Sequence, residues 1–363
     1  MILRLILGHQ QFNHSVLPAM QVFQCDTNQI PDELGEFIQP FVAGVDKPAI
    51  INTRWQSELD RLKLQEPTVI NWHRVNDIKG INTFFKKVNA RLKRGGRFIG
   101  CMETLENRKE RLLKKYPPII NRAYYMADFV LKRVFPKLSL TRNLYFSLTG
   151  GQNRALSKSE ILGRLVYCGF SIEAVKVIEN KLYFVVSKKG EPLTEPEPSH
   201  GVILRIKRIG KNGAPINVYK LRTMHPYAQY IQEYVYEQNN LRNGGKFDND
   251  FRITKWGRFM RKFWIDEVPM IWNILRGDLK IVGVRPLSEH YLSLYSEEHK
   301  RVRIQGKPGL IPPFYADMPS DLNEIMESEA RYIRAYLKDP LMTDFSYGMR
   351  AFNNIFLKKA RSA

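Results

Sequence analysis

Short apolar runs and helically spaced apolar residues follow one another in the first half of the chain. Thr68–Trp72 is a β-branched run typical of a strand, and Ile81–Leu92 has apolar residues at the spacing of one helix face. After a turn at Arg94-Gly95-Gly96, the run Arg97–Met102 has the pattern of a buried strand. We therefore expect a strand, a helix and a strand in succession, as in the units of an α/β domain.

One helix and a hairpin are expected to complete this first part. Lys158–Tyr167 has helical spacing, and Ser157 is a candidate N-cap because its hydroxyl can accept from a free backbone N–H. Phe170–Ile178 and Lys181–Ser187 are strand-like runs joined by Glu179-Asn180, which predicts a hairpin.

Residues 124–148 lie between these elements and have two interpretations. Aromatic and aliphatic residues alternate there with cations, and Pro136 interrupts the pattern. The segment is either a pair of helices packed on the domain or an amphipathic segment that lies on a membrane. The cations are Lys132, Arg133, Lys137 and Arg142.

A proline-rich stretch separates the two halves of the chain. Gly190–Ser199, GEPLTEPEPS, has three prolines and no long apolar run, which is typical of a linker. We expect a first domain over residues 1–189, a linker over 190–200 and a second domain over 201–363.

The second half predicts a hairpin followed by two helices. Val202–Met224 contains two strand-like runs around a Lys211-Asn212-Gly213 turn. A first helix is expected from about Gly257 to Phe263. A second is expected to begin at Asp266 as N-cap, with Pro269 in its first turn.

Asp266 and Glu267 would then lie at a helix N-terminus. The free N–H groups there attract anions, and their field would lower the pKa of Asp266 and keep it ionised. Two adjacent carboxylates among arginines suit phosphate and divalent-metal chemistry. The alternative is that Asp266 only caps the helix and Glu267 is only a favourable first-turn charge.

Composition excludes several classes of protein. The 363 residues are 44% hydrophobic, which excludes wholesale disorder, and the three cysteines are too far apart for a disulfide framework or a Cys-only zinc site. No apolar run reaches the 18 residues of a spanning helix, and the apolar start MILRLILG is too short for a signal peptide. We expect a protein of a reducing compartment, soluble or attached to a surface.

The net charge of +21 requires an anionic partner and is unevenly distributed. Residues 1–190 hold 30 basic and 16 acidic residues, and residues 191–363 hold 27 and 20. The densest basic run, between Lys79 and Lys115, is either a solvated helix face or a patch for phosphates of lipid headgroups or nucleic acid. Since no zinc-finger, RNA-binding or basic-zipper pattern accompanies it, nucleic acid is not the expected partner.

The strings LKRGGRFIGCMET and LGRLVYCGFSIEAVKVIENKLYFVVSKK, within residues 60–190, resemble the second half of a class I methyltransferase fold. The resemblance implies a Rossmann-like α/β domain. That family binds S-adenosylmethionine on a glycine-rich loop, but residues 1–67 contain no G-x-G-x-G. We therefore expect a degenerate, non-catalytic scaffold, with a divergent cofactor site as the alternative.

Residues 202–357 contain five ordered motifs: RIGKNGAP, YKLRTM, RITKWGRFMR, DEVPMIWNILRGD and VGVRP. In this order they resemble the bacterial sugar transferase family, the monotopic polyprenyl-phosphate phosphoglycosyl transferases. The resemblance implies a mostly helical α+β domain with a small β-hairpin. It also implies transfer of a phospho-sugar from a UDP-sugar to polyprenyl phosphate in polysaccharide or lipopolysaccharide biosynthesis.

The resemblance assigns roles to residues of the motifs. Asp266 would be the nucleophile that forms an aspartyl phospho-sugar intermediate, and Glu267 would hold Mg²⁺. Further residues would contact substrate. Arg258, Arg261 and Arg285 would clamp the diphosphate, while Lys220, Arg222 and Asp278 would contact nucleotide, lipid phosphate or metal, or else maintain the fold.

Two departures from the family pattern leave other functions open. The family's apolar re-entrant helix is replaced by the hydrophilic linker, and the stretch Ile311–Tyr315 differs from the family's active-site wall. Lipid access would then use the basic run, residues 124–148 or a membrane partner protein, at the inner face of the cytoplasmic membrane and without a transmembrane helix. The alternatives are a non-catalytic module that binds a nucleotide sugar or a glycan-assembly partner, and a nucleic-acid binder motivated only by charge.

Overall fold

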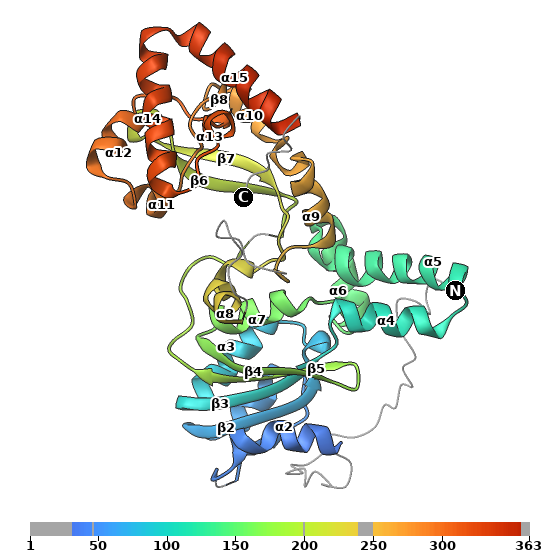
Figure 1. The fold of residues 1–363 in the computed structure, drawn as a ribbon. Helices are drawn as coiled ribbons and strands as arrows, with labels where there is room; N and C mark the ends of the chain where they lie inside the picture. The colour runs from blue at the N-terminus through green and yellow to red at the C-terminus, as the bar shows by residue number, and fades with distance from the viewer. Residues whose placement is uncertain (1–30, 46, 199, 239–249, 357–363) are drawn as a thin grey trace. The chain divides into compact units, whose positions relative to one another are not determined.

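The computed structural model describes residues 31–45, 47–198, 200–238 and 250–356, and the chain divides into two compact units (Figure 1). Unit 1 comprises residues 1–200 and 225–238, and unit 2 comprises 201–224 and 239–363. We expected residues 201–363 to stay together as one domain. The segment His225–Gln238 instead leaves unit 2 and packs within unit 1.

Unit 1 is built on a five-stranded sheet of order β1-β2-β3-β5-β4. β1, β2 and β3 are parallel, whereas β5 is antiparallel to both of its neighbours. The two strands expected around residues 68–102 and the closing hairpin are confirmed. The strands are β1 Ala49–Ile51, β2 Glu66–Arg74, β3 Leu92–Met102, β4 Phe170–Ile178 and β5 Lys181–Lys188.

The predicted turn at Arg94-Gly95-Gly96 is part of β3 rather than a separate turn. Gly95 has φ +75°, and the pairing of β3 with β2 shifts register between Glu66 and Thr68. The strand therefore begins irregularly and continues into the predicted run.

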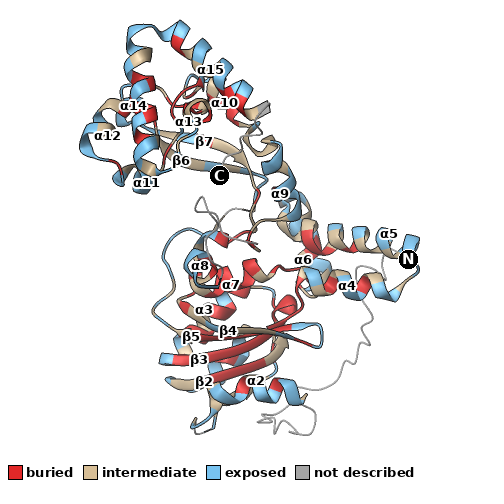
Figure 2. Cartoon of the chain, in the orientation of Figure 1, coloured by how far each residue is buried: buried red, intermediate tan, exposed pale blue. Residues whose placement is uncertain are grey.

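Helices cover both faces of this sheet (Figure 1). On one face, Leu34 and Ile38 pack against Ile70 and Ile99, and on the other Phe98 contacts Phe85. The strands between these layers form the buried core of the unit (Figure 2). The longer helices are α2 Asp32–Val42, α3 Ile81–Arg91, α4 Leu105–Lys115, α5 Pro118–Phe129, α6 Ser139–Thr149, α7 Lys158–Tyr167 and α8 Gln232–Gln238.

The helices expected at residues 81–92 and 158–167 are confirmed as α3 and α7. The Ser157 hydroxyl accepts a 3.2 Å hydrogen bond from the backbone N–H of Glu160, so Ser157 is the N-cap of α7, as predicted. Residues 124–148 form a pair of helices, α5 and α6, joined by irregular turns over Val130–Val134 and Phe135–Lys137.

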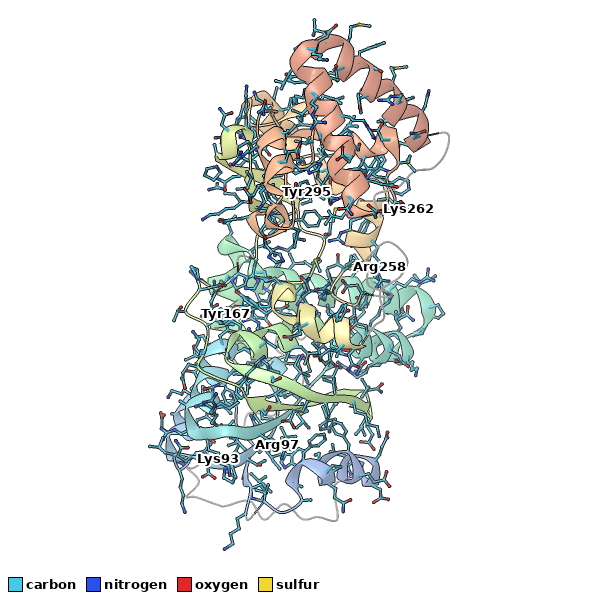
Figure 3. The ribbon with its side chains drawn as sticks, turned by 60° about the vertical axis from the view of Figure 1, so that its left-hand side comes forward. Lys93, Arg97, Tyr167, Arg258, Lys262 and Tyr295 are labelled. Atoms are coloured by element: carbon cyan, nitrogen blue, oxygen red, sulfur yellow. The ribbon has the colours of Figure 1, made fainter. Side chains whose placement is uncertain are left out.

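The basic run between Lys79 and Lys115 does not form one continuous patch. Arg108 is only 3% exposed, and its guanidinium forms a two-bond pair with Asp128 at 2.6 and 2.7 Å. Arg97, on β3, donates to Glu173 at 2.9 Å (Figure 3). Part of the run therefore stabilises the fold of unit 1 instead of facing a partner.

A buried cluster of charges explains why His225–Gln238 belongs to unit 1. Glu160, 1% exposed, pairs with Arg133, Lys137 and Arg164, and Arg133 in turn contacts the His225 ring at 3.3 Å. Gly163 of α7 allows the close approach of this segment, since a Cβ there would lie 2.2 Å from the Tyr227 carbonyl oxygen. These contacts lie outside the transferase-like motifs, and the sequence did not predict them.

Unit 2 is mostly helical, with two small sheets. The predicted hairpin is confirmed as β6 Ile203–Ile209 and β7 Pro215–Leu221, which pair antiparallel, and β8 Lys280–Val282 pairs parallel with β9 Gly309–Ile311. The helices are α9 Lys255–Lys262, α10 Met270–Leu275, α11 Glu289–Ser293, α12 Glu297–Arg303, α13 Phe314–Asp317, α14 Leu322–Lys338 and α15 Pro340–Phe356.

Candidate active site

Asp266 and Glu267 lie on a short 3-10 turn, Ile265–Glu267, before α10. The α-helix begins only at Met270, so the prediction that Asp266 is its N-cap is wrong. The turn is entered through Trp264 in the left-handed region, at φ +53°. Pro269 occupies the N-cap position of α10 and has no N–H that would need a partner.

The pKa of Asp266 is raised, which contradicts the predicted lowering. Burial is the largest cause, followed by the negative charge of Glu267, while Lys220 and Arg261 act in the opposite direction. Because the helix starts four residues later, its N-terminal field does not compensate for burial. The two cations therefore help to keep Asp266 ionised.

Lys220 is the residue that joins the hairpin to this acidic pair. Its Nζ lies 2.6 Å from Oε1 of Glu267, and both side chains are about a quarter exposed (24% and 26%). The structure thus brings the predicted Lys220 into direct contact with the Asp266–Glu267 pair.

A buried asparagine that sequence reasoning missed holds α10 against the hairpin. Asn273 is fully buried; its Oδ1 accepts from the Tyr219 N–H at 3.0 Å, and its Nδ2 donates to the Asn217 carbonyl at 2.6 Å. The amide thus forms hydrogen bonds with backbone groups at the edge of β7 that does not pair with β6, as a neighbouring strand would. The only available signal was the Asn within the string DEVPMIWN.

Two of the predicted contact residues serve the fold in this structure. Asp278 accepts from Asn273 Nδ2 at 3.2 Å and lies 3.5 Å from Arg276 Nε. Arg222 donates through Nε to the Gly201 carbonyl at 2.8 Å, where β6 begins. These contacts are of the kind that the fold-maintenance alternative describes, and the predicted contacts to nucleotide, lipid phosphate or metal stay predictions.

The two arginines of α9 make different hydrogen bonds. Arg261 donates through Nε to Thr223 Oγ1 at 3.0 Å, and its positive charge acts to lower the pKa of Asp266. Arg258 instead reaches the Asp250 carbonyl at 3.4 Å (Figure 3). Gly257 brings α9 against the end of the hairpin, since a Cβ there would lie 2.0 Å from the Thr223 carbonyl oxygen.

Glu267 and Lys220 open into a pocket, which we call the dyad pocket. Arg285, the residue predicted to clamp the diphosphate, lines this pocket. So does Arg208, which sequence reasoning did not single out although it begins the string RIGKNGAP. The altered stretch contributes Phe314 and Tyr315 to the wall. The Tyr315 ring packs edge-on against Trp264, at 5.9 Å between centroids, and so supports the turn that carries Asp266.

Residues 193–358 match the family model described as bacterial sugar transferase. This part of the chain belongs to the bacterial sugar transferase family. Several named relatives are 30–39% identical to this chain over 29–36% of its length.

Three of these relatives carry names that describe sugar transfer. A galactosyl transferase, CpsE, of Streptococcus agalactiae is 34% identical over 133 residues, which are 36% of this chain and 29% of that protein. An undecaprenyl-phosphate galactose phosphotransferase of Salmonella typhimurium is 30% identical, over 36% of this chain and 26% of that protein. A UDP-galactose-lipid carrier transferase of Erwinia amylovora is 31% identical over the same shares. The chain thus matches under a third of the length of these relatives.

The transferase domain offers donors suited to Mg²⁺ shared with a substrate. Among the described residues no cluster of three or more His, Cys, Asp or Glu side chains could hold a metal ion alone. Mg²⁺ ordinarily takes one or two carboxylates and completes its shell with phosphate oxygens and water. The adjacent carboxylates of Asp266 and Glu267 fit this second kind of site.

Proposed function

We propose that this chain transfers a phospho-sugar from a UDP-sugar to polyprenyl phosphate, with Asp266 as the nucleophile, in the synthesis of a cell-surface glycan. The observation that carries the proposal is the dyad pocket. It combines the ion pair of Glu267 with Lys220 and the side chains of Arg208 and Arg285. Asp266 adjoins Glu267 in the chain, and the charge of Lys220 acts on it, but it does not itself line the pocket.

The proposed reaction has two displacements. In the first, a carboxylate oxygen of Asp266 bonds to the sugar-linked phosphorus, and the bond from that phosphorus to the bridging oxygen breaks, so that UMP leaves with the electron pair. In the second, an oxygen of polyprenyl phosphate attacks the same phosphorus and releases Asp266. A covalent carboxylate intermediate divides one difficult displacement into two easier ones.

The charges around Asp266 suit this chemistry. The attack requires the ionised carboxylate, and Lys220 and Arg261 oppose the rise in its pKa. Guanidinium groups bind phosphate oxygens through paired N–H donors, so Arg208 and Arg285 would hold the diphosphate and stabilise the charge that develops on UMP. Glu267 would hold Mg²⁺, which neutralises phosphate charge when bound.

An exposed apolar face on the transferase domain supports a lipid acceptor. Trp256 and Phe259 of α9 and Phe263 at its C-cap follow one another at helical spacing and are 74%, 47% and 55% exposed. The cations Arg258 and Lys262 project from the same helix (Figure 3). An amphipathic helix with aromatic and basic residues is typical of contact with an anionic membrane surface. We place the domain at the inner face of the cytoplasmic membrane.

The long helix α15 presents a second apolar stripe. Leu341, Phe345 and Met349 recur at intervals of four residues and are 84%, 67% and 49% exposed. No helix among the described residues is long and apolar enough to cross a membrane. Surface contact through such stripes is the attachment we propose.

Unit 1 is, in this proposal, a methyltransferase-like scaffold. The support is its strand order, in which antiparallel β5 lies between β3 and β4. After β1 the chain has no glycine-rich loop. Instead the Asn71 side chain joins Thr53 through two hydrogen bonds, from the Thr53 N–H at 3.0 Å and to its carbonyl at 2.9 Å. This clamp occupies the strand end where the cofactor loop of that family would lie.

The proposal is tested by turnover. The full chain is incubated with a panel of UDP-sugars, Mg²⁺ and polyprenyl phosphate in detergent, and released UMP and lipid-linked sugar are measured. We expect both products from at least one UDP-sugar and neither from Asp266→Asn. Asp278→Asn, a carboxylate change outside the dyad pocket, is the matched control and should keep its activity. Binding of a UDP-sugar without turnover would favour the non-catalytic module instead.

A further inference from the structure

A second pocket adjoins the dyad pocket, and the proposed chemistry leaves it unused. The two pockets share Arg208, Arg285, Pro286 and Phe314. The second extends from these residues to Tyr291, Tyr295 and Glu329, and we call it the tyrosine pocket. A ligand whose phosphates lie between the shared arginines could therefore reach into both.

The shared arginines form a site for an anion. Among the described residues, no carboxylate pairs with either guanidinium. Burial and the neighbouring charge of Arg285 lower the pKa of Arg208, which places two like charges close together. Such a pair is stabilised by a bound phosphate.

The far end of the tyrosine pocket is polar and preorganised. Glu329, 2% exposed, accepts from Arg303 Nε at 2.7 Å, and Arg303 also donates to the Arg285 carbonyl. This buried chain of contacts fixes the carboxylate relative to the backbone of Arg285.

Tyr295 supplies an unsatisfied polar group in the same place. It lies inside unit 2 (Figure 3), 4% exposed, and packs with Leu287 and Met326. Burial and the nearby Glu329 carboxylate raise the pKa of Tyr295, and its hydroxyl makes no hydrogen bond of standard geometry among the described residues. Buried polar groups are rarely left unpaired, so this hydroxyl points to a ligand or water.

The walls of the pocket are aromatic, and this combination fits a pyrimidine nucleoside. Tyr291, 40% exposed, and Phe314 provide ring faces for stacking. The ring N–H of uracil can donate to a carboxylate such as Glu329, and a ring carbonyl can accept from the Tyr295 hydroxyl.

We propose that the tyrosine pocket binds the nucleoside half of the UDP-sugar, with Arg208 and Arg285 on the phosphate of the departing UMP. This inference rests on the proposed function for the identity of the donor. It assigns the sugar-linked phosphate to the Asp266 side of the arginines and the base to the Glu329 side.

The test is equilibrium binding, which requires no turnover. UMP and galactose 1-phosphate are titrated calorimetrically into the full-length wild-type chain and into two variants. We expect Tyr291→Ala to raise the Kd for UMP about 5- to 100-fold, because it removes a stacking face. Tyr295→Phe keeps the ring and should raise that Kd about 3- to 10-fold. Trp55→Ala, which removes an exposed aromatic of unit 1 (56% exposed), is the control and should leave that Kd unchanged.

Opposite results would overturn the inference. Unchanged UMP affinity in both variants contradicts it, as does the absence of UMP binding by the wild-type chain. Loss of galactose 1-phosphate affinity alone would assign the pocket to the sugar. The inference and the proposed function fail on different results. If UMP binds through this pocket but no turnover occurs, only the proposed transferase activity is contradicted. If turnover occurs and both variants bind UMP with wild-type affinity, only the assignment of the pocket is contradicted. Thermal melting verifies that each variant is folded.

Discussion

The substitution Asn273→Ala tests how the transferase domain positions its acidic pair. Asn273 satisfies the Tyr219 N–H and the Asn217 carbonyl at the free edge of β7. The same strand carries Lys220, and α10 follows directly after the turn that carries Asp266 and Glu267. Removing the amide should therefore weaken the domain and loosen the contact between Lys220 and Glu267.

The magnitude follows from the two backbone groups left unpaired. A buried group that loses its partner costs about 1–3 kcal/mol, and we use the lower end because both bonds are only partly buried. The sum is about 2 kcal/mol. With a urea m-value of about 2 kcal/mol/M, the unfolding midpoint of unit 2 should fall by about 1 M. A misplacement of about 1 Å at the reacting groups would lower UMP release about 100-fold.

The assay is urea unfolding followed by hydrogen exchange of peptides from unit 2. The Tyr219 amide should exchange faster in Asn273→Ala than in the wild-type chain. Asp278→Asn is the control, since it keeps an oxygen that can accept from Asn273, and its midpoint should stay within about 0.3 M. An unchanged midpoint with unchanged protection of the Tyr219 amide in Asn273→Ala would refute the edge-closure account.

Three further predictions concern the dyad pocket. Lys220→Met removes a cation that lowers the pKa of Asp266, so the acid limb of the pH profile for UMP release should move to higher pH; an unmoved limb would argue against their coupling. The folded pKa of Asp266 lies above its unfolded value of about 3.9, so its ionised form destabilises the folded state above that pH. Asp266→Asn should therefore melt above the wild-type temperature at pH 7.5, and this difference should disappear at pH 3. A lower melting temperature of the variant at pH 7.5 would contradict the raised pKa. Arg208→Ala should raise the Kd for a UDP-sugar about 10- to 100-fold, whereas Arg258→Ala, whose guanidinium reaches Asp250, should change it less than 2-fold.

Local patterns predicted the regular elements of the fold well. The run Thr68–Trp72, the helix at 81–92, the Ser157 cap and both hairpins depend on residue spacing within one element, and all are present in the structure. The predicted start of α10 was wrong because an Asp followed by a Pro is compatible with more than one backbone conformation before a helix. Here the chain takes a 3-10 turn through Trp264 before the α-helix begins.

Features that depend on contacts distant in sequence could not be predicted. The packing of His225–Gln238 within unit 1 depends on Glu160 and Gly163, which are more than 60 residues away in the chain. Arg108 lies in a run with the composition of a surface patch, but in the structure its side chain is buried and forms ion pairs with Asp128 and Glu103. The motifs located the acidic pair, whereas only the structure separated Arg208 and Arg285, which line the pocket, from Arg222, Arg258 and Asp278, which do not.

The central claim is that Asp266 carries the phospho-sugar during the reaction. The most direct measurement is mass spectrometry of the chain after brief incubation with a UDP-sugar and Mg²⁺, without the lipid acceptor. We predict a mass increase equal to one phospho-sugar, located on the peptide that contains Asp266, lost on addition of polyprenyl phosphate and absent from Asp266→Asn. An adduct on another residue, or lipid-linked product formed by Asp266→Asn at the wild-type rate, would contradict the account.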